Sequence, residues 1–478
     1  MSPRLARTAT LAALVFALAC ATAHAATPTA YLYATSWDAQ GARQYAADDA
    51  GILSPLTPPN APAGTTSTGA AASPDGHSLY VVDQGSDTVS QFDVARDGTL
   101  TPKTPATVST GASPFGLAIA PDGSHVYVAN QGAGTVSVFA VCADGRLDRV
   151  GEDVAAGAGA LQVAIAPNGA SAYVTNLSDG TISQYDVGFD GSLTPKSPAT
   201  VAAAPSPTGI AVSPDGASAY VANRTTSGTI SQYDVASDGT LTPKAEPKVA
   251  AGVQPVAVTV TAGSLYASNF GDDTISQYDR DAAGALTPKA TPTVAVGRNP
   301  WGLTASPDGA SLYVAAYSDA AVSQFDIAAD GTLAPKATPS VEAGTHPVAV
   351  AAVAARHART YPFGGFVGPI RNGVTVKAGS TVPIIFSLGG DRGLDVLAAG
   401  SPASGWVRCG TTVPTRTYPA ASDRALRFSS SKGVYVFRWR TKRGWAGTCR
   451  AFVLTLADGS VHQLVVRFGP RCQALQPR

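Results

Sequence analysis

The chain has 478 residues, of which 45% are hydrophobic and 14% charged, with 49 Gly and 35 Pro. A chain so rich in turn-forming residues, yet apolar enough to bury large cores, is globular, which excludes a disordered protein. The formal net charge is zero, but the residues from Arg359 onward contain 17 Lys and Arg against 4 Asp and Glu. The last quarter of the chain is therefore basic and the part before it acidic, which is a clue about partners.

Residues 1–25 have the features of a secretory signal peptide. Two arginines precede an apolar run from Leu11 to Ala19, and Ala25 ends an A-x-A cleavage site. A lipoprotein signal is the alternative, but Ala17 stands where a Leu is required before Cys20. No later segment has the roughly 18 uninterrupted apolar residues of a spanning helix. We expect a secreted, extracellular bacterial protein that associates with the cell envelope and has no transmembrane segment.

A repeat of 46 or 47 residues fills most of the chain. One tyrosine per period marks it, at Tyr80, Tyr127, Tyr173, Tyr220, Tyr266 and Tyr313. Each period contains four short runs rich in β-branched and aromatic residues, separated by Pro-Asp-Gly and Asp-Gly turns, with no helical periodicity. A period of this length with four strands predicts the blade of a β-propeller.

The two flanks of the repeat supply the fragments of one more blade. Six periods are complete, and residues 30–58, "AYLYATSWDAQGARQYAADDAGILSPLTP", provide a second, third and fourth strand without a first. "HPVAVAAVA", His346 to Ala354, provides a first strand with nothing after it. We therefore predict an all-β chain with a seven-bladed β-propeller at residues 26–355. Its last blade is closed by residues 347–354, so that the ring has no exposed edge.

The repeated phrases resemble a known family. "SPDGASAYVANRTTSGTISQYDVASDGTLTPK" and the "YVTN" of residues 173–176 are similar to lactonase-like and YVTN-repeat seven-bladed propellers, over about residues 27–354. Enzymes of that family, related to phosphogluconolactonases and cyclic-muconate enzymes, place an Arg-His pair after the Pro that opens an innermost strand. Here those positions read Phe115-Gly116, Thr208-Gly209 and Trp301-Gly302. The resemblance thus implies the fold, and the missing pair argues against the activity.

Three side chains near the openings of the innermost strands are candidates for a site. Lactone hydrolysis needs a base that activates water and a group that stabilises the oxyanion. His346, beside Pro347, is the candidate base, with a surface loop histidine as the alternative interpretation. Phe115 and Trp301 place rings near one mouth of the channel, where they suit either stacking on a ring-shaped ligand or packing of the channel. No constellation predicts a metal ion or a cofactor.

A ring of polar residues follows the marker tyrosines. Three positions after each tyrosine, counting Tyr33 as the first, stand Ser36, Asp83, Asn130, Asn176, Asn223, Asn269 and Ala316. We expect these side chains to satisfy the backbone of a turn, because the same residue types recur with the fold.

The repeat stops after Ala354, and a second all-β region follows at residues 361–469, with a tail at 470–478. Long alternating strands predict a small β-sandwich of immunoglobulin-like type. "YPFGGFVGPIRNG" and "WAGTCRAF" resemble secreted bacterial domains named for a Pro-x-Lys-Phe (PxKF) motif, although Pro383-Ile384-Ile385-Phe386 has Ile in place of Lys. This resemblance implies architecture and export, not chemistry.

A basic patch is expected on this sandwich, formed by Arg438, Arg440, Lys442, Arg443 and Arg450. In an exported protein it would bind an anionic polymer, a protein or a carbohydrate of the cell envelope. A solvated strand face, or docking onto the acidic propeller, is the alternative. No nucleic-acid-binding motif is present. The sequence therefore favours a monomeric, non-catalytic scaffold near the envelope, with a lactonase-like hydrolase as the alternative.

The cysteines generate a first testable prediction. Cys409 and Cys449 both fall in the predicted sandwich, and an oxidising compartment favours pairing, so we expect a Cys409–Cys449 disulfide. Peptide mapping of the mature protein without reductant should recover the two peptides joined. Recovery of either cysteine free, or joined to Cys142 or Cys472, would contradict the pairing.

Overall fold

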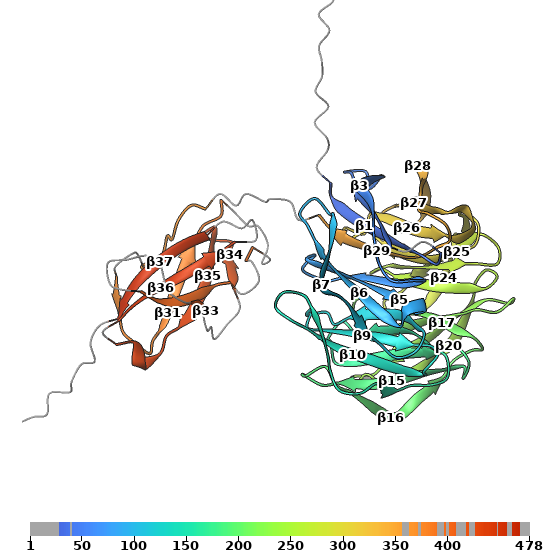
Figure 1. Ribbon diagram of the computed structural model, residues 1–478, viewed down its shortest axis with the longest axis horizontal. Coiled ribbons are helices and arrows are strands. Elements are labelled where there is room, and N and C mark those ends of the chain that lie inside the picture. The colour runs from blue at the N-terminus through green and yellow to red at the C-terminus, as the bar shows by residue number, and fades with distance from the viewer. Residues whose placement is uncertain are drawn as a thin grey trace, which may run out of the picture. The chain divides into compact units, whose positions relative to one another are not determined.

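The structure is a computed structural model that describes residues 28–38, 41–355, 363–370, 374–389, 396–397, 401–407, 417–419, 426–446, 448–456 and 461–468. The chain divides into two compact units, and the boundary between them along the chain falls between Ala354 and Ala355 (Figure 1). Within the described ranges, no helix is long and apolar enough to span a membrane. The predicted signal peptide, residues 1–25, lies outside these ranges.

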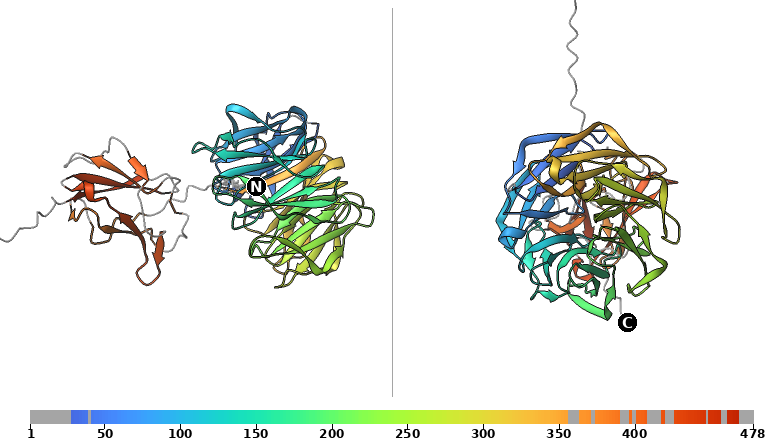
Figure 2. Two further views of the ribbon diagram at one scale, coloured as in Figure 1. Left: turned by 90° about the horizontal axis from the view of Figure 1, so that it is seen from below. Right: turned by 90° about the vertical axis from the view of Figure 1, so that its right-hand side faces the viewer.

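Residues 28–355 form seven antiparallel sheets, which we number blades 1 to 7 in chain order. The innermost strand of each blade contacts the innermost strands of its two neighbours, and blade 7 contacts blade 1 in the same way. The sheets therefore close into a ring, and the colour passes around it from blue through green to gold (Figure 2, right). An all-β seven-bladed arrangement is what the repeat predicted.

The strands of the blades have the following bounds. The innermost strands are β29 (Pro347–Ala354), β4 (Ser67–Ala72), β8 (Pro114–Ile119), β13 (Ala160–Ile165), β17 (Pro207–Val212), β21 (Pro255–Val260) and β25 (Pro300–Ala305). The second strands are β1 (Ala30–Ser36), β5 (Ser78–Asp83), β9 (His125–Asn130), β14 (Ser171–Asn176), β18 (Ser218–Asn223), β22 (Ser264–Asn269) and β26 (Ser311–Ala316). The third strands are β2 (Ala42–Ala47), β6 (Thr88–Val94), β10 (Thr135–Val141), β15 (Thr181–Val187), β19 (Thr229–Val235), β23 (Thr274–Arg280) and β27 (Ala321–Ile327). The outermost strands are β3 (Leu53–Ala61), β7 (Leu100–Ser109), β11 (Leu147–Arg149) with β12 (Val154–Ala155), β16 (Leu193–Ala202), β20 (Leu241–Ala250), β24 (Leu286–Ala295) and β28 (Leu333–Glu342). Short 3₁₀ turns follow two of the second strands, η1 (Gln84–Ser86) and η2 (Tyr317–Asp319).

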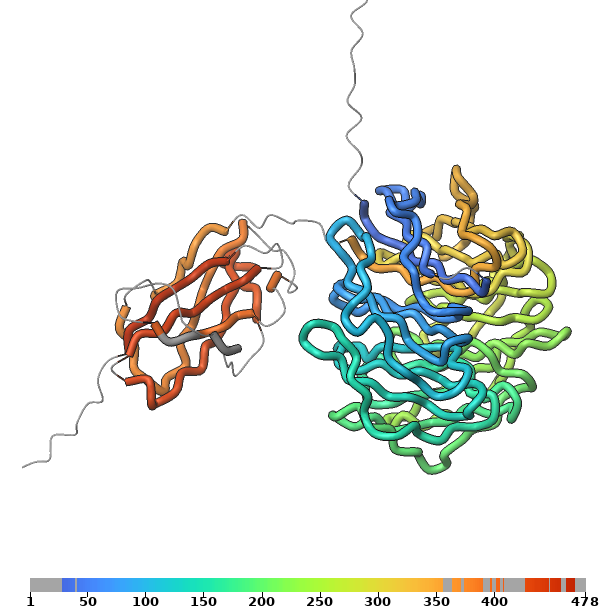
Figure 3. The backbone as a smooth tube through the Cα atoms, in the orientation of Figure 1, coloured from blue at the N-terminus to red at the C-terminus, as the bar shows by residue number. Residues whose placement is uncertain are grey.

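Blade 1 is made from both ends of the unit. Strand β29 pairs antiparallel with β1, from Ala354 opposite Ala30 to Pro347 opposite Ser36. The two segments, dark blue and orange, lie side by side in Figure 3. Because the last strand covers the inner edge of β1, blade 1 has four strands like its neighbours, with β29 as its innermost strand at the channel.

The marker tyrosines connect neighbouring blades. Each lies fully buried on a second strand, and six of the seven donate a hydroxyl hydrogen bond to a glycine carbonyl in the Asp-Gly-type turn of the next blade. The pairs are Tyr33 with Gly98, Tyr80 with Gly145, Tyr173 with Gly239, Tyr220 with Gly284, Tyr266 with Gly331 and Tyr313 with Gly51, at 2.6–2.8 Å. The tyrosine recurs because a buried phenol needs a partner and the turn carbonyl supplies one.

Glutamine and lysine make two further connections of this kind. Six third strands carry a buried Gln whose amide oxygen accepts a hydrogen bond from the first backbone N–H of the next blade's outermost strand: Gln44, Gln91, Gln184, Gln232, Gln277 and Gln324. Five outermost strands carry a buried Lys that pairs with an Asp of its own blade and donates to a turn carbonyl of the next: Lys103, Lys196, Lys244, Lys289 and Lys336. The phrases "SQYD" and "LTPK" therefore repeat because they join blades.

The junction between blade 3 and blade 4 lacks all three connections. The hydroxyl of Tyr127 is buried without a hydrogen-bond partner, and Val138 and Val150 occupy the positions of the connecting Gln and Lys. His125 replaces the Ser that begins the second strand of most blades, and its ring lies against Gly191, the expected partner of Tyr127. Tyr31 lies against Gly98 in the same way in blade 1, where the bond from Tyr33 does form, so ring size alone does not explain the missing bond.

These contacts predict different outcomes for two tyrosine substitutions. Tyr266→Phe removes a hydrogen bond and leaves the buried carbonyl of Gly331 unpaired, so it should lower the free energy of unfolding by about 1–2 kcal/mol. Tyr127→Phe removes a buried hydroxyl that has no partner, so it should leave the free energy of unfolding unchanged or raise it by up to about 1 kcal/mol. Chemical denaturation of the mature chain measures both. Equal losses for the two variants would contradict the role assigned to the tyrosines.

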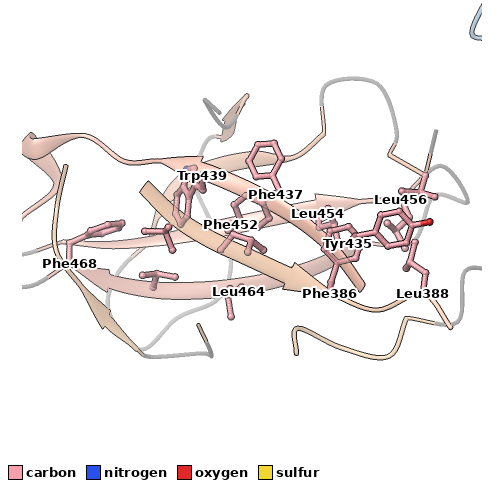
Figure 4. Close-up of a cluster of buried hydrophobic side chains, with 14 residues drawn as sticks. Phe386, Leu388, Tyr435, Phe437, Trp439, Phe452, Leu454, Leu456, Leu464 and Phe468 are labelled. Carbon is pink, nitrogen blue, oxygen red and sulfur yellow. The ribbon is translucent and has the colours of Figure 1, made fainter. Parts of the chain in front are cut away.

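The described part of the second unit contains two sheets. One has the strand order β30 (Thr375–Val376), β37 (Val461–Phe468), β36 (Cys449–Thr455), β32 (Ala403–Val407) and β33 (Thr417–Pro419), and the other has the order β31 (Thr381–Phe386), β35 (Val434–Arg440) and β34 (Arg427–Ser429). A 3₁₀ turn, η3 (Arg443–Trp445), follows β35. Side chains of both sheets share one buried core around Trp439 and Phe452 (Figure 4). The immunoglobulin-like topology and the PxKF assignment stay predictions.

Candidate functional site

The channel of the first unit contains a cavity of about 310 Å³, lined by side chains from all seven innermost strands. The strands approach closely around it: a Cβ atom on Gly209 would lie 2.7 Å from the Cα of Ala257, and one on Gly302 would lie 2.5 Å from the carbonyl oxygen of Val348. Glycine is therefore required at these positions, and the residues that precede them, Thr208 and Trp301, face the cavity.

The polar ring expected three positions after each tyrosine is structural. Asn176, for example, is fully buried and donates hydrogen bonds of 2.9 Å to Thr181 Oγ1 and Ser183 Oγ of its own blade. Asn130, Asn223 and Asn269 make equivalent bonds. The structural role is as predicted, but the bonds go mainly to hydroxyl groups of the third strand and not to the backbone of the turn, and none of these side chains lines the cavity.

The next residue in each blade faces the mouth of the channel. These seven residues, the mouth ring, are Trp37, Gln84, Gln131, Leu177, Arg224, Phe270 and Tyr317. Trp37, Gln131, Leu177 and Arg224 line the cavity directly. Each residue of the mouth ring directly follows the last, buried residue of a second strand. Because side chains alternate in direction along the chain, its side chain points away from the blade and toward the channel mouth. The mouth ring has no common residue type, and sequence analysis missed it.

One arc of the mouth is aromatic. The ring of Trp301 lies 6.3 Å from Phe115, 5.2 Å from Phe270 and 5.9 Å from Tyr317, measured between ring centroids. Phe115 and Trp301, predicted near one mouth of the channel, therefore meet at the cavity. The contacts with Phe270 and Tyr317 extend this pair to the mouth ring. An arc of this kind offers faces on which a cyclic ligand stacks.

Arg224 is the one charged residue among the described residues that line the cavity. Its guanidinium carbon lies 5.0 Å from the centroid of Phe270 and 5.1 Å from that of Trp301. Burial lowers the pKa of Arg224, and within the described part of the chain no carboxylate pairs with it. A half-buried cation held by aromatic rings, whose guanidinium donates to none of the described residues, is suited to an anionic or strongly polarised oxygen of a ligand.

His346 lies at the same end of the channel, directly before β29. Its Nδ1 contacts the carboxylate of Asp38, and its ring stacks on Tyr317 with 4.3 Å between centroids and 19° between planes. The backbone N–H of Trp37 donates to the carbonyl oxygen of His346 at 2.9 Å. Two contacts thus hold the imidazole and one holds its backbone, while the side chain keeps 42% of its surface exposed. Asp38, which orients it, was not recognised in the sequence.

The opposite arc of the mouth carries amides. Gln84 donates to Gln131 at 3.3 Å, and Gln162 reaches from β13 toward Gly116, where a Cβ atom would lie 1.5 Å from its amide oxygen. Thr68 adds a hydroxyl group to the cavity wall. A cavity with aromatic faces on one side and amides on the other can hold a ring that carries hydroxyl groups.

The basic residues predicted on the second unit differ in exposure. Arg438, Arg440, Lys442 and Arg443 are exposed, whereas Arg450 is partly buried, with its guanidinium carbon 4.8 Å from the centroid of Trp445. Burial lowers the pKa of Arg450. Arg450 therefore packs as part of the fold, in contrast to the exposed surface patch that was expected to include it.

The cysteines are only partly described. Cys449 is buried in β36, but Cys409 and Cys472 lie outside the described residues, so the Cys409–Cys449 bridge stays a prediction. Cys142 is free, in a turn of blade 3. Among the described residues, no group of three His, Cys, Asp or Glu side chains is arranged to hold a metal ion.

Comparison with known proteins identifies relatives of the first unit. A family model described as "Lactonase, 7-bladed beta-propeller" matches residues 49–164, 170–300 and 225–367, which together span about two thirds of the chain. No curated protein matches the chain. The match favours the alternative function named above, and the non-catalytic scaffold is not supported.

Solved structures resemble the same unit. A candidate 6-phosphogluconolactonase from Bacteroides fragilis is 22% identical, with a TM-score of 0.61 over 68% of this chain and 98% of that one. A periplasmic gluconolactonase from Pseudomonas aeruginosa is 22% identical, with a TM-score of 0.57 over 68% and 99% of the two chains. A protein from Lactobacillus plantarum is 20% identical, with a TM-score of 0.56 over 68% and 100%. At these identities the likeness shows the fold alone.

The argument against catalysis rested on the missing Arg-His pair at the strand openings. The structure places an arginine and a histidine at the mouth from other backbone positions, so the absence of the adjacent pair does not by itself exclude catalysis. Arg224 follows a second strand, and His346 precedes the proline of an innermost strand. A motif defined by adjacent residues does not detect such an arrangement.

The buried polar ring generates a pH-dependent prediction at Asp83, its acidic member. Burial raises the pKa of Asp83, and hydrogen bonds from Ser90 and Ser67 offset this only in part. A raised carboxyl pKa in the folded state means that the ionised group destabilises the fold above its unfolded pKa of about 3.9. Asp83→Asn, which installs the residue found in four other blades, should therefore raise the melting temperature at pH 7.

The advantage of Asp83→Asn should vanish below about pH 4, where the carboxyl is protonated in both states. Melting curves of parent and variant from pH 3 to pH 8 measure this. A variant less stable than the parent at pH 7, or an advantage that does not depend on pH, would show that the carboxylate is not penalised by burial.

Proposed function

Because the chain belongs to the lactonase family of seven-bladed β-propellers, we propose that it is a lactone hydrolase whose active site is the channel mouth. The observation that carries the proposal is the placement of Arg224, a half-buried cation without a carboxylate partner among the described residues, in the lining of the cavity. The His346–Asp38 pair lies outside that lining, and the contacts of Trp301 and Tyr317 connect it to Arg224. Hydrolysis of a lactone needs a base for water and a group for the oxyanion, and these residues are of the required types.

His346 acts as the general base. Asp38 contacts Nδ1, so that nitrogen carries a proton and Nε2 is the atom that accepts one from water. Stacking on Tyr317 fixes the plane of the imidazole, and the backbone bond from Trp37 fixes the position of the residue. The water oxygen then adds to the carbonyl carbon of the lactone as its proton passes to Nε2.

Arg224 stabilises the negative charge that develops on the carbonyl oxygen. The cavity is small and partly apolar, so a charge-assisted hydrogen bond contributes more there than in bulk water. Collapse of the tetrahedral intermediate breaks the bond between the carbonyl carbon and the ring oxygen, which takes the proton from Nε2. The product is a hydroxy acid, and His346 returns to its neutral form.

The remaining side chains of the mouth position the lactone ring. Trp301 and Phe115 offer faces for stacking, and Gln131 and Thr68 offer hydrogen-bonding groups to ring hydroxyls. The cavity of about 310 Å³ is at the lower end of the range for small-molecule sites, which suits a single ring.

The predicted export fits this proposal. With a signal peptide at residues 1–25, the enzyme would act on lactones outside the cytoplasm. The second unit would then serve as an accessory module, and its exposed Arg438, Arg440, Lys442 and Arg443 would bind anionic polymers of the envelope.

The proposal predicts turnover by the purified mature protein. Glucono-1,5-lactone should be hydrolysed above its spontaneous rate, and His346→Ala should lower kcat by about 10²–10⁴-fold. Arg224→Leu should lower it by about 10²–10³-fold, the loss typical of an oxyanion donor. Asp38→Asn should shift the pH profile of kcat as well as its height, because it changes the group that orients the base.

His125→Ala is the matched control, because this histidine lies at the start of β9, next to the turn after β8, and away from the channel mouth. It should keep the activity of the parent. The proposal fails if the parent does not exceed the spontaneous rate, or if folded His346→Ala is as active as the parent.

A further inference from the structure

Carboxylates surround the mouth of the channel. Five of them accept hydrogen bonds of 2.7–2.9 Å from backbone N–H groups in the loops that lead into the innermost strands: Asp87, Asp179, Asp272, Asp273 and Asp319. The donors are Ser113, Ala158, Val253, Asn299 and Arg298, each one or two residues before an innermost strand. Together with Asp38, these six carboxylates form what we call the acidic rim.

Positive charge does not balance the acidic rim. Arg298 is the cation of these loops, and its Nε already pairs with Asp319 Oδ1 at 2.6 Å. The five connecting lysines bind carbonyls of the Asp-Gly-type turns, which lie at the opposite end of the blades. Over residues 28–355 the chain has 29 acidic and 13 basic side chains. An entering ligand therefore meets a negative potential and, inside the cavity, one guanidinium.

We infer that the site selects electrically neutral, unphosphorylated lactones and discriminates against phosphorylated ones, an inference that rests on the proposed function and names its substrate class. A phosphate monoester carries about −1.5 to −2 charges at pH 7 and three acceptor oxygens, so it needs several cationic donors. The described lining of the cavity supplies Arg224 alone, and the proposed chemistry uses it at the carbonyl oxygen. A neutral ring needs no second cation and is not repelled by the acidic rim.

The same charge arrangement acts on the product. Addition of water opens the neutral ring to a hydroxy acid, which releases its proton and leaves as a carboxylate. The acidic rim repels that anion, so product inhibition should be weak at low ionic strength and should strengthen as salt screens the rim over a Debye length of about 10 Å at 0.1 M. One rim thus admits the substrate and favours release of the product.

The test compares glucono-1,5-lactone with its 6-phosphate. In low salt, kcat/KM should be at least about tenfold higher for the uncharged lactone, and added salt should narrow the difference. The variant Asp87→Asn/Asp179→Asn/Asp272→Asn removes three charges of the rim and keeps a side-chain oxygen to accept each hydrogen bond. It should raise kcat/KM for the phosphorylated lactone about threefold or more, while the uncharged lactone changes less than about twofold.

Asp97→Asn/Asp190→Asn/Asp238→Asn is the matched control. It removes the same charge from Asp-Gly turns at the other end of the blades, where each aspartate caps its own turn. This control should leave the discrimination unchanged. A parent enzyme that prefers the phosphorylated lactone, or equal effects of the two triple variants, would overturn the inference.

Failure of the proposed function is recognised separately. If neither lactone is hydrolysed, the hydrolase proposal is wrong, and the charge selection is then judged by binding. Titration of tryptophan fluorescence with gluconate and with 6-phosphogluconate should show tighter binding of gluconate, with a smaller difference in the rim variant than in the turn variant. Equal or tighter binding of the phosphorylated acid would overturn the inference.

Discussion

The pairing of β29 with β1 is the contact on which the rest of the first unit depends. It joins strands from the two ends of the unit and closes the ring. It also assembles the candidate site, because Asp38 follows β1 and His346 precedes β29, and the two residues are 308 positions apart in sequence. A propeller that failed to close would lose its cooperativity and its His–Asp pair together, so folding and chemistry share one requirement.

The repeat divides each blade into positions that hold the ring and positions that are free to change. The marker tyrosine and its glutamine and lysine partners bond to the next blade, and the residue three positions after the tyrosine bonds to the third strand of its own blade. The residue four positions after the tyrosine makes none of these structural bonds. Trp37, Arg224 and Tyr317 occupy this position in their blades. Seven similar blades can therefore support a mouth with different side chains on every side.

This division also explains what could be predicted from the sequence. A 47-residue period and a leftover strand at 347–354 indicate seven blades, because every blade repeats the bonds that hold it. The mouth ring was not predicted because its seven residues share no chemical type. A search for periodic residues finds Asn176 and its equivalents, which stand one position earlier. Asp38 lies in the incomplete first repeat, and only the closed ring shows that it faces His346. Of the candidate residues, Phe115 and Trp301 were recognised because they depart from the repeat, and His346 because it lies at the entry of an innermost strand.

The junction between blades 3 and 4 has one more consequence. Every other junction carries at least two of the three connecting bonds, whereas Tyr127, Val138 and Val150 supply none. The two ends of the first unit meet in blade 1, where β1 and β29 pair, although a ring of blades can in principle be opened at any junction. Circular permutation would exploit this: new ends placed in the loop between β12 and β13 would break none of the three connecting bonds, although Tyr185 donates to the carbonyl of Ala155 at this junction. A peptide linking Ala30 to Ala354 would make the pairing of β1 and β29 local in sequence and so lower the entropy cost of bringing Asp38 and His346 together.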